Sequence, residues 1–330
     1  LSYGHSRRVM ASHKTLIVAL TNILLEEGAK VHSNPDVRCL CQSSKVDSGF
    51  YEQQIQESRL EAAECLACIA AAMDANKSSA NLELILNTLT KVLCDHEKGE
   101  ERVIATKGLR SLARTHDSRL FLAKWPELLD ALADICLENY NTDDALIAAE
   151  TLSMIVSEMN PSMSIYNYGL NSITKVMSKE DNKCTELSIK ILLRQSFGQE
   201  NTRVMSNNTQ LLDSLARVAG DHNYNIFIRE KATETIKNLS SDMSNGERMA
   251  NPAILSSLVK VSSLSGAGFS RARRLSIEAL IHISNLVSNR RVMATQVGLL
   301  TSLIRYLRSQ PDSDLSMSVS TTIKKLTPVL

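Results

Sequence analysis

The segment Glu230-Lys-Ala-Thr-Glu-Thr-Ile-Lys-Asn-Leu-Ser240 decides the fold, because it carries a spacing that recurs along the chain. Its small residue, Ala232, is followed four and seven positions later by Ile236 and Leu239, so the three lie on one face of a helix. A small residue followed after four positions by a large apolar one occurs six more times. The large apolar residue falls at Leu66, Leu109, Leu152, Leu192, Ile236, Leu280 and Ile323, at intervals of 43, 43, 40, 44, 44 and 43.

A second signature keeps phase with the first. Arg7-Arg-Val-Met-Ala11 recurs as Arg290-Arg-Val-Met-Ala294, with weaker copies at Thr202–Ser206 and Arg248–Ala250. Thirteen residues after five of the large apolar positions stand Leu122, Ile165, Met205, Met249 and Met293. These patterns predict an all-α fold of repeats, each with a short first helix, a second helix and a longer third helix. One repeat cannot bury its own apolar face, so the repeats must stack.

The spacing predicts a single repeat domain over residues 1–330, with about seven repeats of roughly 43 residues. The stretch at about 28–50 is rich in Gly, Ser, Asn and Asp and has no helical period, which predicts an inserted loop. Because the chain opens at Leu1 in mid-pattern, we expect an N-terminally truncated fragment. The expected repeats are 1–75 with the loop 28–50, then 76–118, 119–160, 161–200, 201–244, 245–288 and 289–330.

The composition suits helices and argues against a β-sandwich, since aromatic residues are only 4% of the chain while hydrophobic residues are 43%. The net charge is +1, but residues 260–330 hold ten Lys/Arg and three Asp/Glu, so the C-terminal third is basic. Seven scattered Cys, an odd number, indicate a reducing compartment, and we expect a cytoplasmic or nuclear protein, or one found in both. No stretch reaches the 18 apolar residues of a membrane span.

At Glu230–Ser240 the sequence resembles the armadillo repeat family, whose third helix ends in a similar Asn-Leu-Ser. Asn289–Ala294 followed by Gly298–Leu303 resembles the first and second helices of that family. The related HEAT repeats stay open as an alternative, because the Asn before Leu is clear only at Asn238. The resemblance covers nearly the whole chain and implies a right-handed α-α superhelix, in which third helices line a concave groove that binds extended peptides.

The resemblance also allows a comparison with the nuclear-import adaptors of that family, which carry a ladder of Trp and Asn in the groove. At the Asn positions this chain has Cys68, Ser111, Met154, Arg194, Asn238, His282 and Lys325, and no Trp stands at the Trp positions. Only Asn238 matches, so we do not expect binding of nuclear localisation signals.

A basic stripe is expected along the groove instead. Lys107, Arg110 and Arg114 share one helix face at i, i+3 and i+7. We predict that the stripe binds acidic or extended segments of a protein partner. A solvated helix face is the competing interpretation. The candidate partner-binding residues are Lys107, Arg110, Arg114, Lys190, Arg194, Lys237, Asn238, His282, Lys324 and Lys325.

No pattern in the sequence predicts catalysis, a metal or a cofactor. Cys65-x-x-Cys68 lies in an Ala-rich helix, where buried thiols are expected rather than zinc ligands. The seven His show no ligand spacing, and no Gly-rich phosphate loop follows a strand. We therefore expect no enzyme and no small-molecule substrate.

The sequence favours a non-catalytic protein–protein interaction scaffold. Two alternatives stay open. One is a nucleic-acid-binding repeat that uses the basic C-terminal third, although few aromatic residues are available to stack on bases. The other is the substrate-recruiting region of a larger enzyme, such as a ubiquitin ligase.

Overall fold

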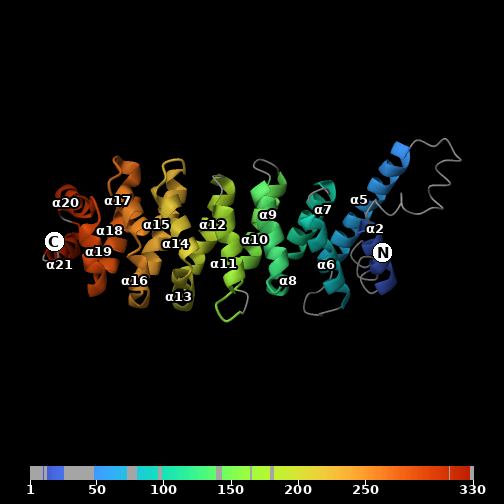
Figure 1. The fold of residues 1–330 in the computed structure, drawn as a ribbon, viewed down its shortest axis with the longest axis horizontal. Helices are drawn as coiled ribbons and strands as arrows, with labels where there is room; N and C mark the ends of the chain where they lie inside the picture. Colours follow the sequence, from blue (N-terminus) through green and yellow to red (C-terminus); the bar gives the residue numbers. More distant parts are fainter. Residues whose placement is uncertain are drawn as a thin grey trace. The chain divides into compact units, whose positions relative to one another are not determined.

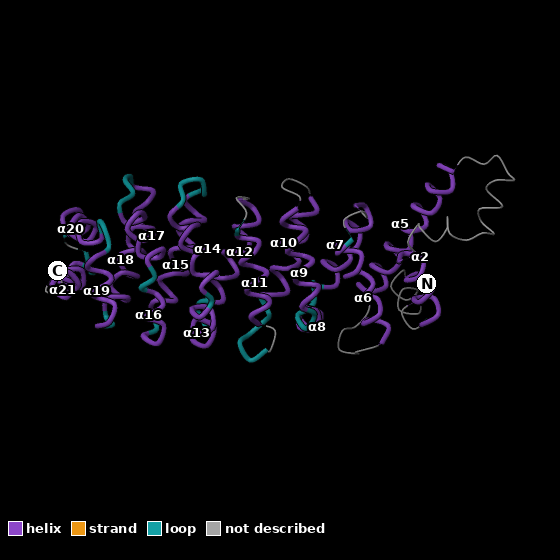
Figure 2. The backbone as a smooth tube through the Cα atoms, in the orientation of Figure 1, coloured by secondary structure: helices purple, strands orange, loops and turns teal. Residues whose placement is uncertain are grey.

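The structure is a computed structural model that describes residues 10, 13–25, 48–72, 80–95, 99–138, 143–163, 166–178, 182–311 and 313–327. The described residues form α-helices, two short 3-10 helices and connecting loops, with no strand among them (Figure 2). This confirms the predicted all-α fold class. By their internal contacts the residues group into two compact units, Leu1–Glu158 and Met159–Leu330, and the single repeat domain stays a prediction. We call them the N-terminal and C-terminal units and describe each separately.

The N-terminal unit contains three pairs of second and third helices (Figure 1). The third helices α5, α7 and α10 contact one another in turn, and so do the second helices α2, α6 and α9. The helices are α2 (Lys14–Leu25), α5 (Ser48–Ala72), α6 (Ala80–Cys94), α7 (Gly99–Leu112), α8 (His116–Leu122), α9 (Pro126–Glu138) and α10 (Asp143–Val156).

The C-terminal unit has four such pairs, again with third helices in contact with third helices and second with second. The second and third helices are α11 (Tyr166–Met177), α12 (Asn182–Gln195), α14 (Thr209–Gly220), α15 (Ile226–Ser241), α17 (Pro252–Ser262), α18 (Ser270–Ser284), α20 (Leu299–Ser309) and α21 (Ser316–Leu326). The first helices are α13 (Gln199–Asn207), α16 (Gly246–Met249), which follows the 3-10 turn η1 (Met243–Asn245), and α19 (Val287–Thr295). A second 3-10 turn, η2 (Ala267–Phe269), precedes α18.

The third helices are buried along the face that the repeat signature marks. All seven small positions are buried, and so are six of the seven large apolar positions. The exception is Ile323 on α21, which is half-buried. The small positions are Ala62, Ala105, Ala148, Ser188, Ala232, Ser276 and Val319.

A buried asparagine joins repeats in the C-terminal unit. Asn245 Nδ2 donates to the carbonyl of Leu239, at the end of the preceding third helix, and to the carbonyl of Thr202, in the first helix of the preceding repeat. Asn289 Nδ2 makes the equivalent bonds to Ile283 and Gly246, at 3.0 and 2.7 Å. Because helix C-termini leave carbonyls without partners, one side chain both caps a third helix and ties two repeats together.

Two details differ from the approximate bounds given above. The first helices begin before the predicted repeat boundaries at 119, 201 and 289, since α8 starts at His116, α13 at Gln199 and α19 at Val287. The predicted boundaries followed the Arg-Val-Met signature, which lies inside these helices rather than at their start. Most of the predicted loop 28–50 lies outside the described residues, but its last three residues belong to α5.

The prediction of buried thiols was wrong for Cys65 and Cys68, which are both exposed. Cys94 is exposed too, whereas Cys136 and Cys184 are buried. Whether a cysteine side chain is buried depends on the rotation of its helix about the helix axis. The Ala-rich composition does not indicate this rotation.

A first prediction concerns the contact between α5 and α7. A Cβ placed on Gly108 would lie 2.3 Å from Cβ of Ala67 and 2.9 Å from its Cα, so a backbone must shift. Gly108→Ala should therefore lower the free energy of unfolding by about 1–3 kcal/mol, despite the helix preference for Ala. Gly99→Ala is the matched control, because nothing lies within 4 Å of a Cβ at that end of the same helix. Urea unfolding followed by circular dichroism should show destabilisation for Gly108→Ala alone.

A second prediction tests the asparagine tie. Asn245→Ala leaves two buried carbonyls and the Ser206 hydroxyl, which is 2.7 Å from Asn245 Oδ1, without that partner. The loss should cost about 1–3 kcal/mol. Asn207→Ala, at an exposed position of α13, is the control and should stay within about 0.5 kcal/mol of the wild type. Equal urea midpoints for the two variants would contradict the assigned role.

Candidate protein-binding surface

One side of each third helix faces outward. The positions two residues before and two residues after the large apolar residue are exposed or half-buried on all seven third helices, except at Asn238. We call this surface, separately in each unit, the third-helix face. Five of the ten residues predicted to bind a partner stand at these exposed or half-buried positions, namely Lys107, Lys190, Arg194, His282 and Lys325. Arg110, Lys237 and Lys324 are one residue after the large apolar position, Arg114 follows the end of α7, and Asn238 is buried.

In the N-terminal unit the predicted basic stripe is interrupted by acid. Lys107 and Arg114 are exposed, and neither forms an ion pair with another described residue. Arg110, between them, pairs with Glu150 of the neighbouring α10 at 3.1 Å. Glu64 on α5 is exposed on the same face. The stripe in this unit is therefore a mixture of signs.

In the C-terminal unit, charges pair along the N-terminal halves of the third helices. Arg271 Nη1 and Nη2 lie 3.2 and 3.1 Å from Glu230 and Glu234 on the preceding third helix. Arg274 Nε and Nη2 lie 2.9 and 2.6 Å from Glu278 and Asp314. The predicted residue Lys190 belongs to this pattern, since its Nζ is 2.6 Å from Glu186 Oε1. These pairs leave little uncompensated charge on this half of the face.

The C-terminal halves of the same helices differ. Between the large apolar residue and the helix end, α12, α15, α18 and α21 contain no Asp or Glu. Arg194 and Lys324 are exposed and Lys237 is half-buried, and none of the three forms an ion pair with another described residue. We call Arg194, Lys237, His282, Lys324 and Lys325 the cationic row.

Asn238 does not belong to the exposed surface, contrary to the prediction. Its side chain is 7% exposed, and its Nδ2 donates to Oγ of Ser196 in the preceding repeat at 2.9 Å. Asn238 matches the family's Asn position in the sequence, but in this structure its side-chain amide forms a hydrogen bond between two repeats.

His282 sits half-buried within the cationic row. Its Nδ1 is buried and has no hydrogen-bond partner among the described residues. Burial is the main effect and lowers the pKa of the imidazole, and the charge of Lys237 lowers it further. A hydrogen bond to the Lys237 backbone and the charge of Glu278 raise this pKa, but they do not outweigh the burial. The ring is therefore neutral at pH 7. Close by, Lys325 Nζ donates to Oδ1 of Asn285, three residues after His282, at 3.1 Å.

Arginines that cap helix ends were missed by the sequence reasoning. Arg229 Nε donates to the carbonyl of Ala219 at the end of α14, and Arg273 Nη1 donates to the carbonyls of Leu264 and Gly266 after α17. Arg102, at the equivalent position of α7, lies 2.8 Å from Glu138 at the end of α9. The signal was present, since each of these arginines stands seven residues before a large apolar position.

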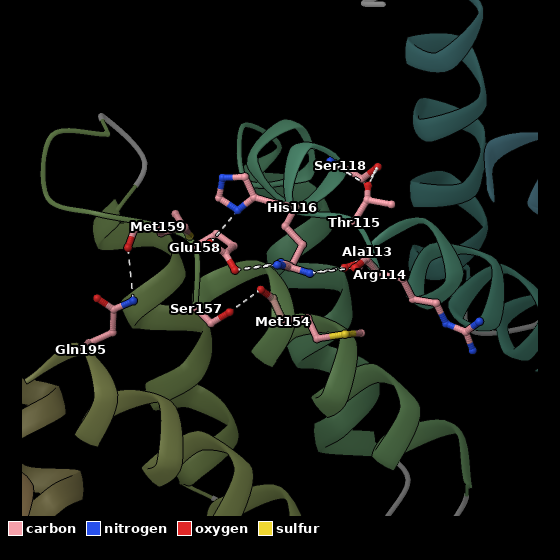
Figure 3. Close-up of polar contacts among 11 residues, drawn as sticks. Ala113, Arg114, Thr115, His116, Ser118, Met154, Ser157, Glu158, Met159 and Gln195 are labelled. Carbon is pink, nitrogen blue, oxygen red and sulfur yellow. Dashed lines mark hydrogen bonds and ion pairs between the residues drawn. The ribbon is translucent and has the colours of Figure 1, made fainter. Parts of the chain in front are cut away.

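A polar cluster ends the N-terminal unit (Figure 3). Glu158 Oε1 accepts hydrogen bonds from Arg119 Nε and Nη2 at 3.0 and 2.7 Å, and Oε2 lies 3.0 Å from His116 Nδ1. Arg119 also donates to the carbonyls of Ala113 and Arg114 after α7. Partial burial alone would raise the pKa of Glu158, but the hydrogen bonds and charges of Arg119 and His116 hold it below its ordinary value. The cluster ties neighbouring repeats together.

The described residues lack two further features. They contain no group of three His, Cys, Asp or Glu that could hold a metal ion. Among the described helices, none has both the length and the apolar character needed to cross a bilayer.

Comparison with known proteins identifies the fold. A computationally designed armadillo repeat protein for modular peptide recognition superposes with a TM-score of 0.52 at 13% sequence identity, covering 73% of this chain and 99% of the designed one. The chain has the armadillo repeat fold.

A structure from work on a phosphorylation switch in the interaction between cadherin and beta-catenin also matches. It has a TM-score of 0.49 and 14% identity, covering 99% of this chain and 61% of that one. No protein-family model matches the sequence, and no curated protein matches it. The predicted armadillo resemblance is confirmed at the level of the fold, while the number of repeats stays a prediction.

A third prediction follows from the ion pairs that tie these armadillo repeats. Glu158→Gln removes the charge that pairs with Arg119 and should lower the melting temperature at pH 7. The folded pKa of Glu158 lies below its ordinary value, so its stabilisation is present above about pH 4.3 and is lost as the pH falls through the folded pKa. The melting temperatures of wild type and variant should therefore converge as the pH falls through the folded pKa of Glu158. A difference that stays constant with pH would show that the charge of Glu158 does not stabilise the fold.

Proposed function

We propose that this chain is a protein-interaction scaffold that binds acidic, extended segments of a partner protein on the third-helix face, without catalysis of its own. The observation that carries the proposal is the cationic row of the C-terminal unit. Elsewhere on the third helices of this unit, Lys190, Arg271 and Arg274 are paired with Asp or Glu, but this row contains no acidic residue. An uncompensated row of cations on a protein of net charge +1 favours an anionic partner.

The repeat geometry supports an extended partner. Packed helices lie about 8–10 Å apart, so equivalent side chains on α12, α15, α18 and α21 recur at about that interval. An extended chain advances about 3.3 Å per residue and can therefore contact several third helices in succession. The designed armadillo protein of the same fold was made for modular peptide recognition, which agrees with this use of the face.

The nucleic-acid alternative loses much of its basis. It depended on arginines of the basic C-terminal third, and four of them have internal partners. Arg271 and Arg274 are paired with carboxylates, while Arg273 and Arg290 donate to backbone carbonyls. Phosphates would have to compete with these partners.

Recruitment of substrate to a larger enzyme remains compatible with the same binding surface, and it is kept as the second candidate. The full-length gene product would decide it, because a catalytic domain outside these residues would be visible in its sequence. We further propose a reducing cytoplasmic or nuclear setting, which the exposed free thiols of Cys65, Cys68 and Cys94 favour.

A fourth prediction tests the binding surface. Arg194, Lys237 and Lys324 are all changed to Glu, and partners from native lysate are identified by affinity capture and mass spectrometry. The matched control reverses Arg248, Arg291 and Arg305, which are exposed on first and second helices, so both variants change the net charge by the same amount. Both should keep the wild-type circular dichroism spectrum.

Partners with acidic segments should be captured by the wild type and the control, and should fall at least tenfold with the cationic-row variant. Such a loss corresponds to about 1.4 kcal/mol or more in binding free energy. If the same partners bind all three proteins equally, the cationic row is not the binding surface.

A further inference from the structure

His282, in the cationic row, has a ring nitrogen that forms no hydrogen bond with another described residue. Nδ1 of His282 is shielded from solvent and lacks a hydrogen-bond partner among the described residues, although buried nitrogens usually have one. The residue stands at the outward position of α18, two residues after Leu280, so the ring borders the third-helix face.

The surroundings of the ring favour an anion. A hydrogen bond to the backbone of Lys237, on α15, raises the pKa of the ring, while the charge of the Lys237 ammonium acts on the ring and lowers it. Lys325 of α21 is held at Asn285, less than one turn further along α18. The one carboxylate that acts on the ring, Glu278, is already bound to Arg274 at 2.9 Å.

Other elements that pack on α18 bring one further carboxylate toward this end of the helix, Glu247 of α16, whose Oε1 accepts from Ser288 Oγ at 3.5 Å. Arg290 of α19 is turned to the carbonyl of Ser284, and Lys260 of α17 is exposed. The short helix α16 carries Glu247 and Arg248, both exposed and opposite in sign. The η2 turn, Ala267–Phe269, has no charged residue.

From this geometry we infer that Lys237, His282 and Lys325 form a carboxylate-binding subsite of the cationic row, and that binding there is coupled to uptake of a proton by His282. This inference rests on the proposed function, since it specifies how the row binds an acidic protein segment. In the free protein the imidazole is neutral. A carboxylate placed beside it stabilises the imidazolium, so the ring takes a proton from solvent and both groups become a charged pair.

The pKa of His282 in the free and the bound protein determines how the affinity for a carboxylate changes with pH. Burial and Lys237 keep the pKa of free His282 below its ordinary value, and an anion within about 4–6 Å raises it by about one unit or more. Affinity should therefore increase as the pH falls from about 8 to about 5.5. Glutamate carboxyls stay ionised over that range because their ordinary pKa is about 4.3. A shift of one unit corresponds to about a tenfold gain in affinity.

The fifth prediction is a titration with a fluorescein-labelled peptide of alternating Glu and Ser, measured by anisotropy between about pH 8 and about pH 5.5. The wild type should bind severalfold more tightly at the lower pH, up to a limit of about tenfold for a one-unit shift. His282→Asn should bind with the same affinity at both, because its amide does not titrate. His222→Asn, in an exposed turn of the same unit, is the matched control and should behave as wild type. Calorimetry in buffers of different ionisation enthalpy should show proton uptake for the wild type and none for His282→Asn.

The outcomes separate this inference from the function on which it rests. If the peptide binds with the same pH dependence to His282→Asn as to the wild type, the inference is wrong and the scaffold proposal stands. If the peptide binds neither protein at any pH, while both keep their circular dichroism spectra, the cationic row does not bind acidic segments and both proposals fail.

Discussion

The structure depends on the close approach of each third helix to its neighbours within a unit. A small residue at the fourth position before the large apolar one is buried on all seven third helices, and Gly108 lies so near Ala67 that a methyl group would not fit. Because a repeat exposes its apolar face unless another repeat covers it, this packing provides most of the burial that stabilises each unit. On each third helix, the outward side is the part left exposed to other molecules.

The same packing determines the charge of that outward side. Third helices in contact bring Arg271 beside Glu230 and Glu234, and Arg274 beside Asp314, so charges from successive repeats neutralise one another. Exposed pairs of this kind contribute little to stability, about 0–1 kcal/mol each, but they remove charge from the surface. The C-terminal ends of α12, α15, α18 and α21 have no acidic residues that could neutralise their Lys and Arg. The positive charge of the cationic row follows from this lack of acidic neighbours.

Much of the fold could be predicted because its signal is local. The spacing of Ala232, Ile236 and Leu239 fixes one helix face, and its recurrence predicts stacking. Asn245 and Asn289 also recur, 44 residues apart, and aligning the repeats would have revealed their common position. The pairing of Arg110 with Glu150 was not predictable in this way, because it depends on the relative rotation of two helices. Cys65 shows the same limit: the equivalent Gly108 is packed against α5, whereas Cys65 is exposed on the first third helix described.

The most direct test of the account is hydrogen–deuterium exchange mass spectrometry of the chain with and without a saturating acidic peptide. Ligand contact at the cationic row predicts slower exchange in the C-terminal turns of α12, α15, α18 and α21, with the first helices α13, α16 and α19 unchanged. Protection confined to the first helices, or to the second helices α14, α17 and α20, would contradict the claim that the third-helix face binds the partner.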